Sequence, residues 1–345
     1  MYKAAKKKDH PLVVMMMDYR VQLMRLNFSD EVGVIVNPEA KFIGLDQIDV
    51  REISHCDGLL LCIPKEDRSR LLVWNPYWGR GQLRWIEHTH NHHLLDKHLF
   101  GRLDRYTYGL GYNNSSSQYK ILRFIDYPLK FVEFKIYDFN SDSWRILDLF
   151  PPDNDWCIQF GERGLSLKGN TYWFAAEANN YDAISFLVCF DFTTETFSPL
   201  LPLPFEAFPE DTLSLSSSST SLVVLFQSVD TLEMEIWISN TIEQPNALSW
   251  NSKVFLSANI KQLISPHWNF PISACFFIDQ EKKVAVVFDK YARYGTSTRE
   301  IAYVFFGGGV DDDGSFLKQQ VVKESAFPLC YSCACYYVPS LVQLN

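Results

Sequence analysis

The unit that decides the fold is clearest at residues 134–147, FKIYDFNSDSWRIL, where an apolar stretch meets a polar turn and then a second apolar stretch. Apolar and polar side chains alternate along the arms, as expected when a strand buries one of its faces. Asn140 and Asp142 belong to residue types that tolerate tight-turn conformations. The pattern therefore predicts a β-hairpin.

Hairpin patterns of this kind recur along the chain. They occupy residues 71–86 and 186–201 and, more loosely, residues 234–256 and 274–288. Further strand pairs are predicted between them, such as the pair on either side of the compact turn at residues 168–170. A unit of about four short strands that recurs every 40–65 residues or so is typical of a propeller blade.

We therefore expect an all-β fold, a single β-propeller of four-stranded blades, with six blades favoured and seven as the alternative. Strands near residues 12–17, 21–28 and 335–338 are expected to share one blade and to close the ring from both ends. Two stacked β-sandwiches are the competing architecture. In domain terms, residues 1–10 are predicted to be a basic tail or linker remnant, and residues 11–345 the propeller.

Composition narrows the range of functions. The 345 residues are 47% hydrophobic and carry a net charge of -9, which argues against a general nucleic-acid binder because such proteins need positive charge to neutralise phosphates. The longest early apolar run, residues 12–17, is far shorter than the roughly 20 residues that cross a bilayer. We expect a protein without nucleic-acid or membrane partners in the cytoplasm or nucleus.

Several motifs resemble one known family. HCDGLLLC at residues 55–62 and LVWNP at residues 72–76 are similar to the start of the F-box associated β-propeller (type 1) of plant F-box proteins. Later stretches appear in the order that this family shows. They are YGLGY at 108–112, YKILRF at 119–124, YDF at 137–139, GLSLKGNTYW at 164–173 and the segment 187–203.

The resemblance implies a protein-interaction module that recognises substrates for an SCF-type E3 ubiquitin ligase. In that family an F-box ahead of the propeller binds the ligase adaptor, and the propeller holds the target protein. No F-box pattern precedes Pro11 here, so the adaptor-binding module is expected to be absent and the adaptor is doubtful as a partner. The identity of the target stays open.

Contact with a target is predicted for aromatic and arginine side chains on loops, because these residue types dominate binding hot spots. The alternative for Trp78 and Trp156 is that they pack over blade ends. The predicted contact residues are Tyr77, Trp78, Arg80, Trp156, Tyr291 and Tyr294.

No catalytic, cofactor or metal site is predicted. His55, Cys56 and Asp57 are consecutive, so neighbours point to opposite faces of a strand and do not form a nucleophile–base pair. Asp57 and Gly58 are instead expected to turn the chain. The five histidines between residues 88 and 98 are predicted to lie in a solvated loop. Two alternatives remain: an enzyme with a site in the central channel, and a truncated product without a retained function.

A cysteine-rich segment lies near the C-terminus, at Cys330, Cys333 and Cys335. A zinc module would need a second cysteine pair at usable spacing, and none is present. The surrounding residues have strand character, and residues two apart on a strand face the same side. We therefore expect buried thiols in the blade that closes the ring.

Overall fold

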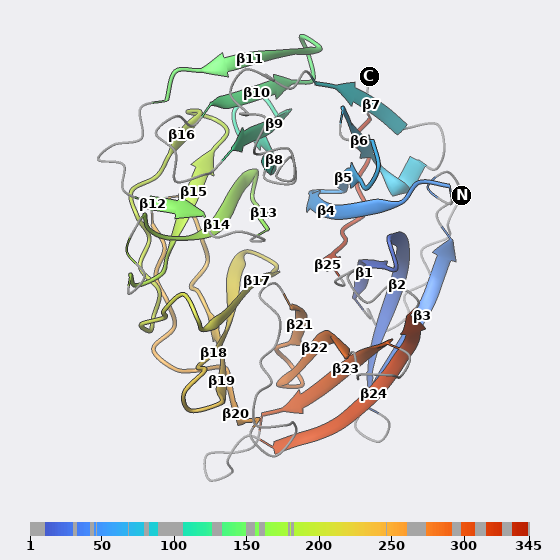
Figure 1. The fold of residues 1–345 in the computed structure, drawn as a ribbon, viewed down its shortest axis with the longest axis vertical. Coiled ribbons are helices and arrows are strands. Elements are labelled where there is room, and N and C mark those ends of the chain that lie inside the picture. The colour runs from blue at the N-terminus through green and yellow to red at the C-terminus, as the bar shows by residue number, and fades with distance from the viewer. Residues whose placement is uncertain are drawn as a thin grey trace, which may run out of the picture.

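The computed structural model describes residues 11–29, 33–41, 45, 47–67, 69–78, 83–88, 106–125, 133–149, 156–158, 163–178, 180, 183–245, 247–260, 274–291, 298–307, 315–325 and 333–343. Within this part of the chain, the strands form six antiparallel sheets around a central axis (Figure 1). Each sheet runs outward from the axis, so the molecule is a six-bladed β-propeller. The fold prediction is confirmed, with the favoured blade number.

The first three blades contain the following strands, given from the axis outward. Blade 1 consists of β25 (Cys333–Tyr336), β1 (Leu12–Met17), β2 (Arg20–Ser29) and β3 (Gly33–Lys41). Blade 2 consists of β4 (Val50–Cys56), β5 (Leu59–Pro64), β6 (Arg70–Trp74) and β7 (Leu83–Glu87). Blade 3 consists of β8 (Tyr106–Asn113), β9 (Gln118–Ile125), β10 (Phe134–Asp138) and β11 (Ser143–Leu147).

The other three blades follow in chain order. Blade 4 consists of β12 (Trp156–Ile158) and β13 (Leu165–Leu167), which both pair with β14 (Asn170–Glu177), and then β15 (Phe186–Asp191) and β16 (Thr196–Phe197). Blade 5 consists of β17 (Thr212–Ser218), β18 (Ser221–Gln227), β19 (Glu233–Ile238) and β20 (Leu256–Asn259). Blade 6 consists of β21 (Cys275–Asp279), β22 (Val284–Tyr291), β23 (Thr298–Phe306) and β24 (Ser315–Ser325).

Both ends of the chain share blade 1, as predicted. Strand β25 pairs antiparallel with β1, with Val13 opposite Tyr336 and Met16 opposite Cys333. The Tyr336 hydroxyl bonds the backbone of Ile278 in blade 6, donating to its carbonyl at 2.7 Å and accepting from its N–H at 2.9 Å. The closing strand therefore connects the last blade to the first without a covalent link.

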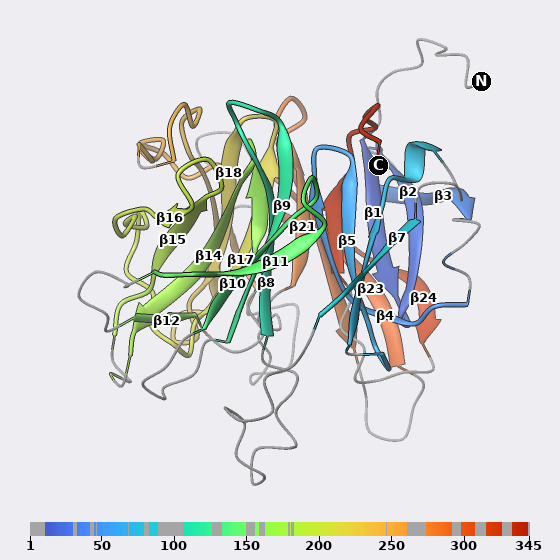
Figure 2. The ribbon, with the colours of Figure 1, turned by 90° about the horizontal axis from the view of Figure 1, so that it is seen from above.

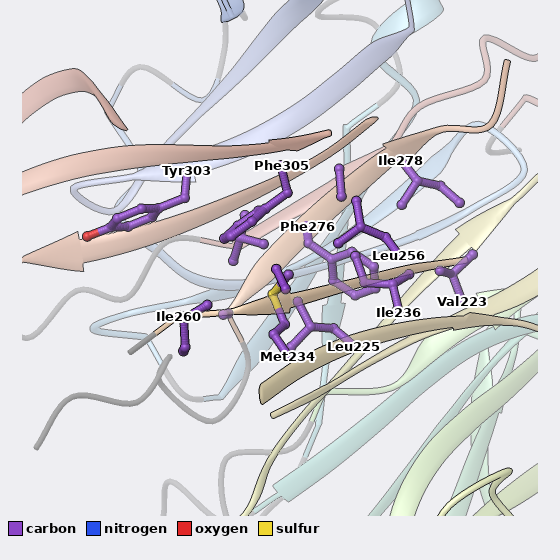
Figure 3. Packing of buried hydrophobic residues seen from close by; sticks show 14 of the residues in the cluster. Val223, Leu225, Met234, Ile236, Leu256, Ile260, Phe276, Ile278, Tyr303 and Phe305 are labelled. Atoms are coloured by element: carbon purple, nitrogen blue, oxygen red, sulfur yellow. The ribbon is translucent and has the colours of Figure 1, made fainter. Parts of the chain in front are cut away.

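Apolar packing between blades forms the core. In the described residues, one cluster of buried side chains lies between each pair of neighbouring blades. Figure 3 shows the cluster between blades 5 and 6, where Leu225, Ile236 and Met234 meet Phe276 and Phe305. A blade has two broad faces and cannot bury them alone, so the closed ring is the state in which every blade is covered.

The hairpin at residues 274–288 holds a different position from the one its pattern indicated. We grouped it with 134–147, which forms the outer pair β10–β11, but it forms the inner pair β21–β22 of blade 6. The outer pair of that blade is β23–β24. Alternation along a strand reports that one face is buried, and it carries no information on distance from the axis.

The two faces of the ring are distinguished by their loops. We call the face that carries the β4–β5 turn at Asp57 and Gly58 and the C-terminal residues 337–343 the tail face, and the other the opposite face. Figure 2 shows the C-terminal end at this side of the ring. The β1–β2 turn at Asp18 lies on the opposite face, because β1 runs antiparallel to β25.

Candidate functional site

Two exposed aromatic side chains follow strand β6 on the tail face. Tyr77 is 53% exposed and Trp78 is 39% exposed, and their rings meet edge to face with centroids 5.4 Å apart. They lie in a 3₁₀ turn at residues 76–78. Exposed large aromatic rings in a fixed position are typical of binding hot spots.

Asn75 fixes this turn and the C-terminal tail together. Its side chain is fully buried; the Oδ1 atom accepts from the N–H of Tyr77 at 3.0 Å, and Nδ2 donates to the carbonyls of Ser340 and Val342 at 3.1 and 2.6 Å. Trp78 adds a bond from its indole N–H to the carbonyl of Val342 at 3.1 Å. The aromatic pair is thus held before any partner arrives, which lowers the entropic cost of binding.

Two apolar side chains of the tail are exposed on the same face. Val338 is 62% exposed and Leu341 is 69% exposed. We call the set Tyr77, Trp78, Val338 and Leu341 the apolar patch. The four side chains come from two segments, the turn after β6 and the tail, which Asn75 and Trp78 join by hydrogen bonds, and exposed apolar side chains of this kind suit protein contact.

A pocket of about 530 Å³ lies on the tail face between blades 2 and 3, bordered on one side by the tail. Asp57, Arg84, Tyr112, Tyr119 and Val342 are among its lining residues. Its volume falls within the roughly 300–1,000 Å³ of ligand pockets in proteins. The pocket and the apolar patch are neighbours because Ser340 and Val342, which line the pocket, flank Leu341 of the patch in the chain.

The hydroxyl groups of two tyrosines from blade 3 converge on Asp57 of blade 2. Tyr112 donates to the Asp57 carboxylate, and Tyr119 donates to the Asp57 carbonyl at 3.4 Å. The two rings lie 5.3 Å apart at 57°. Burial, followed by the negative charge of Asp57, raises the pKa of Tyr112, so its hydroxyl stays protonated and continues to donate.

The position of Asp57 is fixed by the backbone next to it. Asp57 and Gly58 adopt positive φ angles of 43° and 91°. The N–H of Gly58 donates to Nε2 of His55 at 2.9 Å, and a Cβ atom on Gly58 would lie 2.1 Å from Oγ of Ser340. Only glycine therefore fits between the turn and the tail.

Arg84, on the other side of the pocket, is engaged within the protein. Its guanidinium lies 2.9 Å from the Asp142 carboxylate and donates to the Tyr137 hydroxyl at 3.1 Å. Asp142 also accepts from the Tyr137 hydroxyl. Burial and the Asp142 carboxylate raise the pKa of Tyr137 to about 12. This network holds the β10–β11 turn against blade 2.

The central channel contains a cavity of about 70 Å³ with a mixed lining. Its walls carry serine hydroxyls, the thiols of Cys275, Cys333 and Cys335, and the side chains of His55 and Arg163. Burial raises the pKa of each of these thiols, so they remain protonated and weakly nucleophilic. Within the described residues, no group of three or more His, Cys, Asp or Glu side chains has a metal-holding arrangement.

The six predicted contact residues do not form one surface. Tyr77 and Trp78 lie together on the tail face. Trp156 lies at the start of β12 opposite Glu177, at the opposite face, and its ring packs against Phe197 at 5.3 Å. Tyr291 ends β22, also at the opposite face. Arg80 and Tyr294 lie outside the described residues.

His88 differs from the prediction of a solvated loop. It is buried, with its ring 6.3–6.5 Å from the rings of Tyr106, Tyr108 and Trp144. It occupies an inter-blade aromatic cluster rather than an exposed loop. The other four histidines of that run lie outside the described part of the chain.

The residues at the centre of the pocket were not predicted as functional. Asp57 was correctly predicted to turn the chain, whereas Tyr112 and Tyr119 were noted as parts of the motifs at residues 108–112 and 119–124. The one feature of the sequence that could have pointed to Tyr112 and Tyr119 is that an aromatic residue lies on each side of the turn at residues 113–118. That signal does not reveal which neighbouring blade supplies the facing group.

Comparison with known proteins agrees with this architecture. The family model described as "F-box associated beta propeller domain" matches residues 12–344. A putative F-box protein of Arabidopsis thaliana is 49% identical over 347 residues, covering 98% of this chain and 85% of the relative. An F-box/kelch-repeat protein of the same plant is 44% identical over 365 residues, covering 99% of this chain and 86% of the relative.

Among solved structures, a fungal lectin from Aleuria aurantia described as a six-bladed β-propeller aligns with a TM-score of 0.42 and 9% identity, covering 79% of this chain and 77% of the lectin. The matched family is described by its fold and its association with the F-box, not by a reaction.

The described part of the chain contains no helix that is long and apolar enough to span a bilayer.

Proposed function

Because the chain belongs to the F-box associated β-propeller family, we propose that its tail face binds target proteins and so selects substrates for an SCF-type E3 ubiquitin ligase. The observation that carries this proposal is the aromatic pair Tyr77 and Trp78, exposed yet held by the buried Asn75. Rigid aromatic anchors give contact area at low entropic cost, and the neighbouring pocket supplies polar groups for specificity.

The test is quantitative affinity capture from a plant-cell extract with the full chain as bait. The Tyr77→Ser/Trp78→Ser double variant removes both anchors, and Ile146→Ser is the matched control because Ile146 is exposed on the outer strand β11. We expect target proteins to be retained by the wild type and the control, and to fall about tenfold or more with the double variant. Targets lost only from Ile146→Ser would contradict a tail-face surface.

The ligase role has its own readout in the same experiment. The ligase adaptor and the cullin are probed in every capture. Their recovery with both variants, independent of the targets, supports the ligase role. Specific targets recovered with neither adaptor nor cullin would contradict it while leaving the tail-face surface intact.

A further inference from the structure

The chemistry of the pocket between blades 2 and 3 identifies what kind of side chain it accepts. Within the described lining, two residues carry charge, Asp57 and Arg84. Arg84 is already paired with Asp142 at 2.9 Å and bonded to Tyr137. The Asp57 carboxylate accepts from the neutral Tyr112 hydroxyl, and among the described residues no cation is paired with it. The described part of the lining therefore presents one net negative charge to an incoming group.

Aromatic surface surrounds this charge. Tyr112, Tyr119 and Phe139 line the same pocket, and the first two rings are 5.3 Å apart. The face of an aromatic ring attracts cations, and the attraction grows where water is partly excluded. A carboxylate flanked by tyrosine rings is complementary to a cation with a flat, weakly hydrated head group.

The carboxylate is also fixed in advance. The positive φ angles of Asp57 and Gly58, the bond from Gly58 to His55 and the close approach of Ser340 leave the turn little freedom. The chain as a whole carries a net charge of -9, which favours the approach of basic partners. Geometry, local charge and overall charge thus favour the same class of ligand.

We propose that this pocket binds a basic side chain of the partner protein, with arginine preferred over lysine, and that Asp57 supplies the counter-charge. This inference rests on the proposed function for the existence of a protein partner. The adjacent apolar patch then receives an apolar residue of the same partner segment. The planar guanidinium stacks on the tyrosine rings and bonds the carboxylate, which an ammonium group does less well.

The test is a titration of the full chain followed by backbone-amide NMR, with N-acetyl-argininamide as the probe. N-acetyl-citrullinamide has nearly the same shape as the arginine probe but no charge. N-acetyl-lysinamide has the positive charge but lacks the planar head group. We expect argininamide to shift the amides around Asp57 and Tyr119 with millimolar affinity, the lysine probe to bind more weakly, and the citrulline probe to bind about tenfold more weakly.

Two variants test whether argininamide binds at Asp57. Asp57→Asn removes the charge and keeps a residue that tolerates positive φ, so the turn is preserved. Argininamide should bind this variant about fivefold more weakly than the wild type. Asp230→Asn, an exposed site on the opposite face, should change nothing. Equal binding of the arginine and citrulline probes, or unchanged binding to Asp57→Asn, would overturn the proposal. Tighter binding of the lysine probe would overturn the preference for arginine.

These outcomes separate the pocket from the proposed function. If the Tyr77→Ser/Trp78→Ser variant loses its targets while Asp57→Asn retains both its targets and its argininamide binding, the tail face binds proteins without a basic anchor. If argininamide binds at Asp57 but the Tyr77→Ser/Trp78→Ser variant captures as much target as the wild type, the pocket is supported as a binding site and the apolar patch is contradicted.

Discussion

At the scale of single residues, the tail face depends on His55 acting as a neutral hydrogen-bond acceptor. Its Nε2 accepts from the N–H of Gly58, and its ring lies 5.5 Å from that of Tyr337. Burial lowers the pKa of His55 to about 4. Protonation would remove the acceptor that supports the Asp57–Gly58 turn.

The lowered pKa of His55 predicts how stability responds to pH. The unfolded chain has a histidine pKa near 6.5 and binds the proton more readily than the folded chain, so the stabilisation is complete above about pH 6.5 and declines as pH falls towards 4. Between about pH 6.5 and pH 4, the free energy of unfolding of the wild type should fall by about 3 kcal/mol more than that of His55→Gln. Urea unfolding of both proteins from pH 7.5 to 4.5 measures this difference; parallel curves would contradict it.

Gly58 is predicted to control the position of the tail. In Gly58→Ala the new methyl group collides with Ser340, and the positive φ angle is strained. We therefore expect the free energy of unfolding to fall by about 1–3 kcal/mol and residues 337–343 to detach from the turn. Hydrogen exchange of the tail amides measures the release.

The double variant Gly58→Ala/Ser340→Gly separates the two causes. It removes the two shortest contacts of the new methyl group, those with Oγ and Cβ of Ser340, while the backbone strain remains, so the tail should regain much of its protection. A tail that exchanges equally fast in the single and double variants would show that strain alone decides its position.

At the scale of elements, the first and last blades are joined on the opposite face by the β1–β2 turn. Asp18 of that turn lies 3.3 Å from Nζ of Lys290 and 2.7 Å from Nζ of Lys323, and Lys290 also pairs with Glu300 at 3.1 Å. Burial alone would raise the pKa of Asp18, but hydrogen bonds from Lys323, Ser325 and Lys290 outweigh it and lower the pKa.

Asp18→Asn should therefore weaken the contact between blades 1 and 6. Asparagine tolerates the positive φ of 52° at this position, so the effect reports the lost charge, and we expect a loss of about 2–3 kcal/mol at neutral pH. Because its pKa is lowered, the Asp18 contribution is fully present above the unfolded pKa, declines as pH falls below that value and is lost once pH falls through the folded pKa. Chemical denaturation of the wild type and Asp18→Asn at pH 7 measures the loss of stability, and the same comparison at pH 3 measures how much of the difference disappears in acid.

Lys323→Met is the companion variant for this cluster. Lys323 is more exposed than Lys290, so its removal leaves the buried Lys290 with Asp18 and should cost less than Asp18→Asn. A larger cost for Lys323→Met would contradict the assignment of Asp18 as the centre of the cluster.

The sequence predicts hairpins well because alternation and turn residues are local signals. The turn at Asp57 and Gly58 and the hairpin at 134–147 were predicted from neighbouring residues, and both are present. The radial position of 274–288 depends on how many strands of its own blade follow it, and the burial of His88 depends on the rings that the next blade supplies. The pocket was missed because Asp57 and Tyr119 belong to different blades and meet only when blades 2 and 3 pack against each other.

At the scale of the whole molecule, ring closure rests on β25. This strand pairs with β1 and bonds blade 6 through Tyr336. A propeller without its closing strand leaves the inner edge of β1 unpaired and uncovers the clusters on either side of blade 1.

Removal of residues 333–345 should abolish the single cooperative unfolding transition, whereas removal of residues 338–345 should preserve it because β25 remains. Calorimetry of the two truncated chains provides the comparison. Equal transition midpoints would contradict closure by β25.

The surface of the ring that we expect to meet other proteins is the tail face. The direct measurement is photocrosslinking with a photoreactive phenylalanine analogue placed at Leu341 on the tail face or at Val321 on the outer strand β24, both exposed. We predict a specific protein adduct from position 341 and none from position 321. The same adduct from 321 alone would contradict the account.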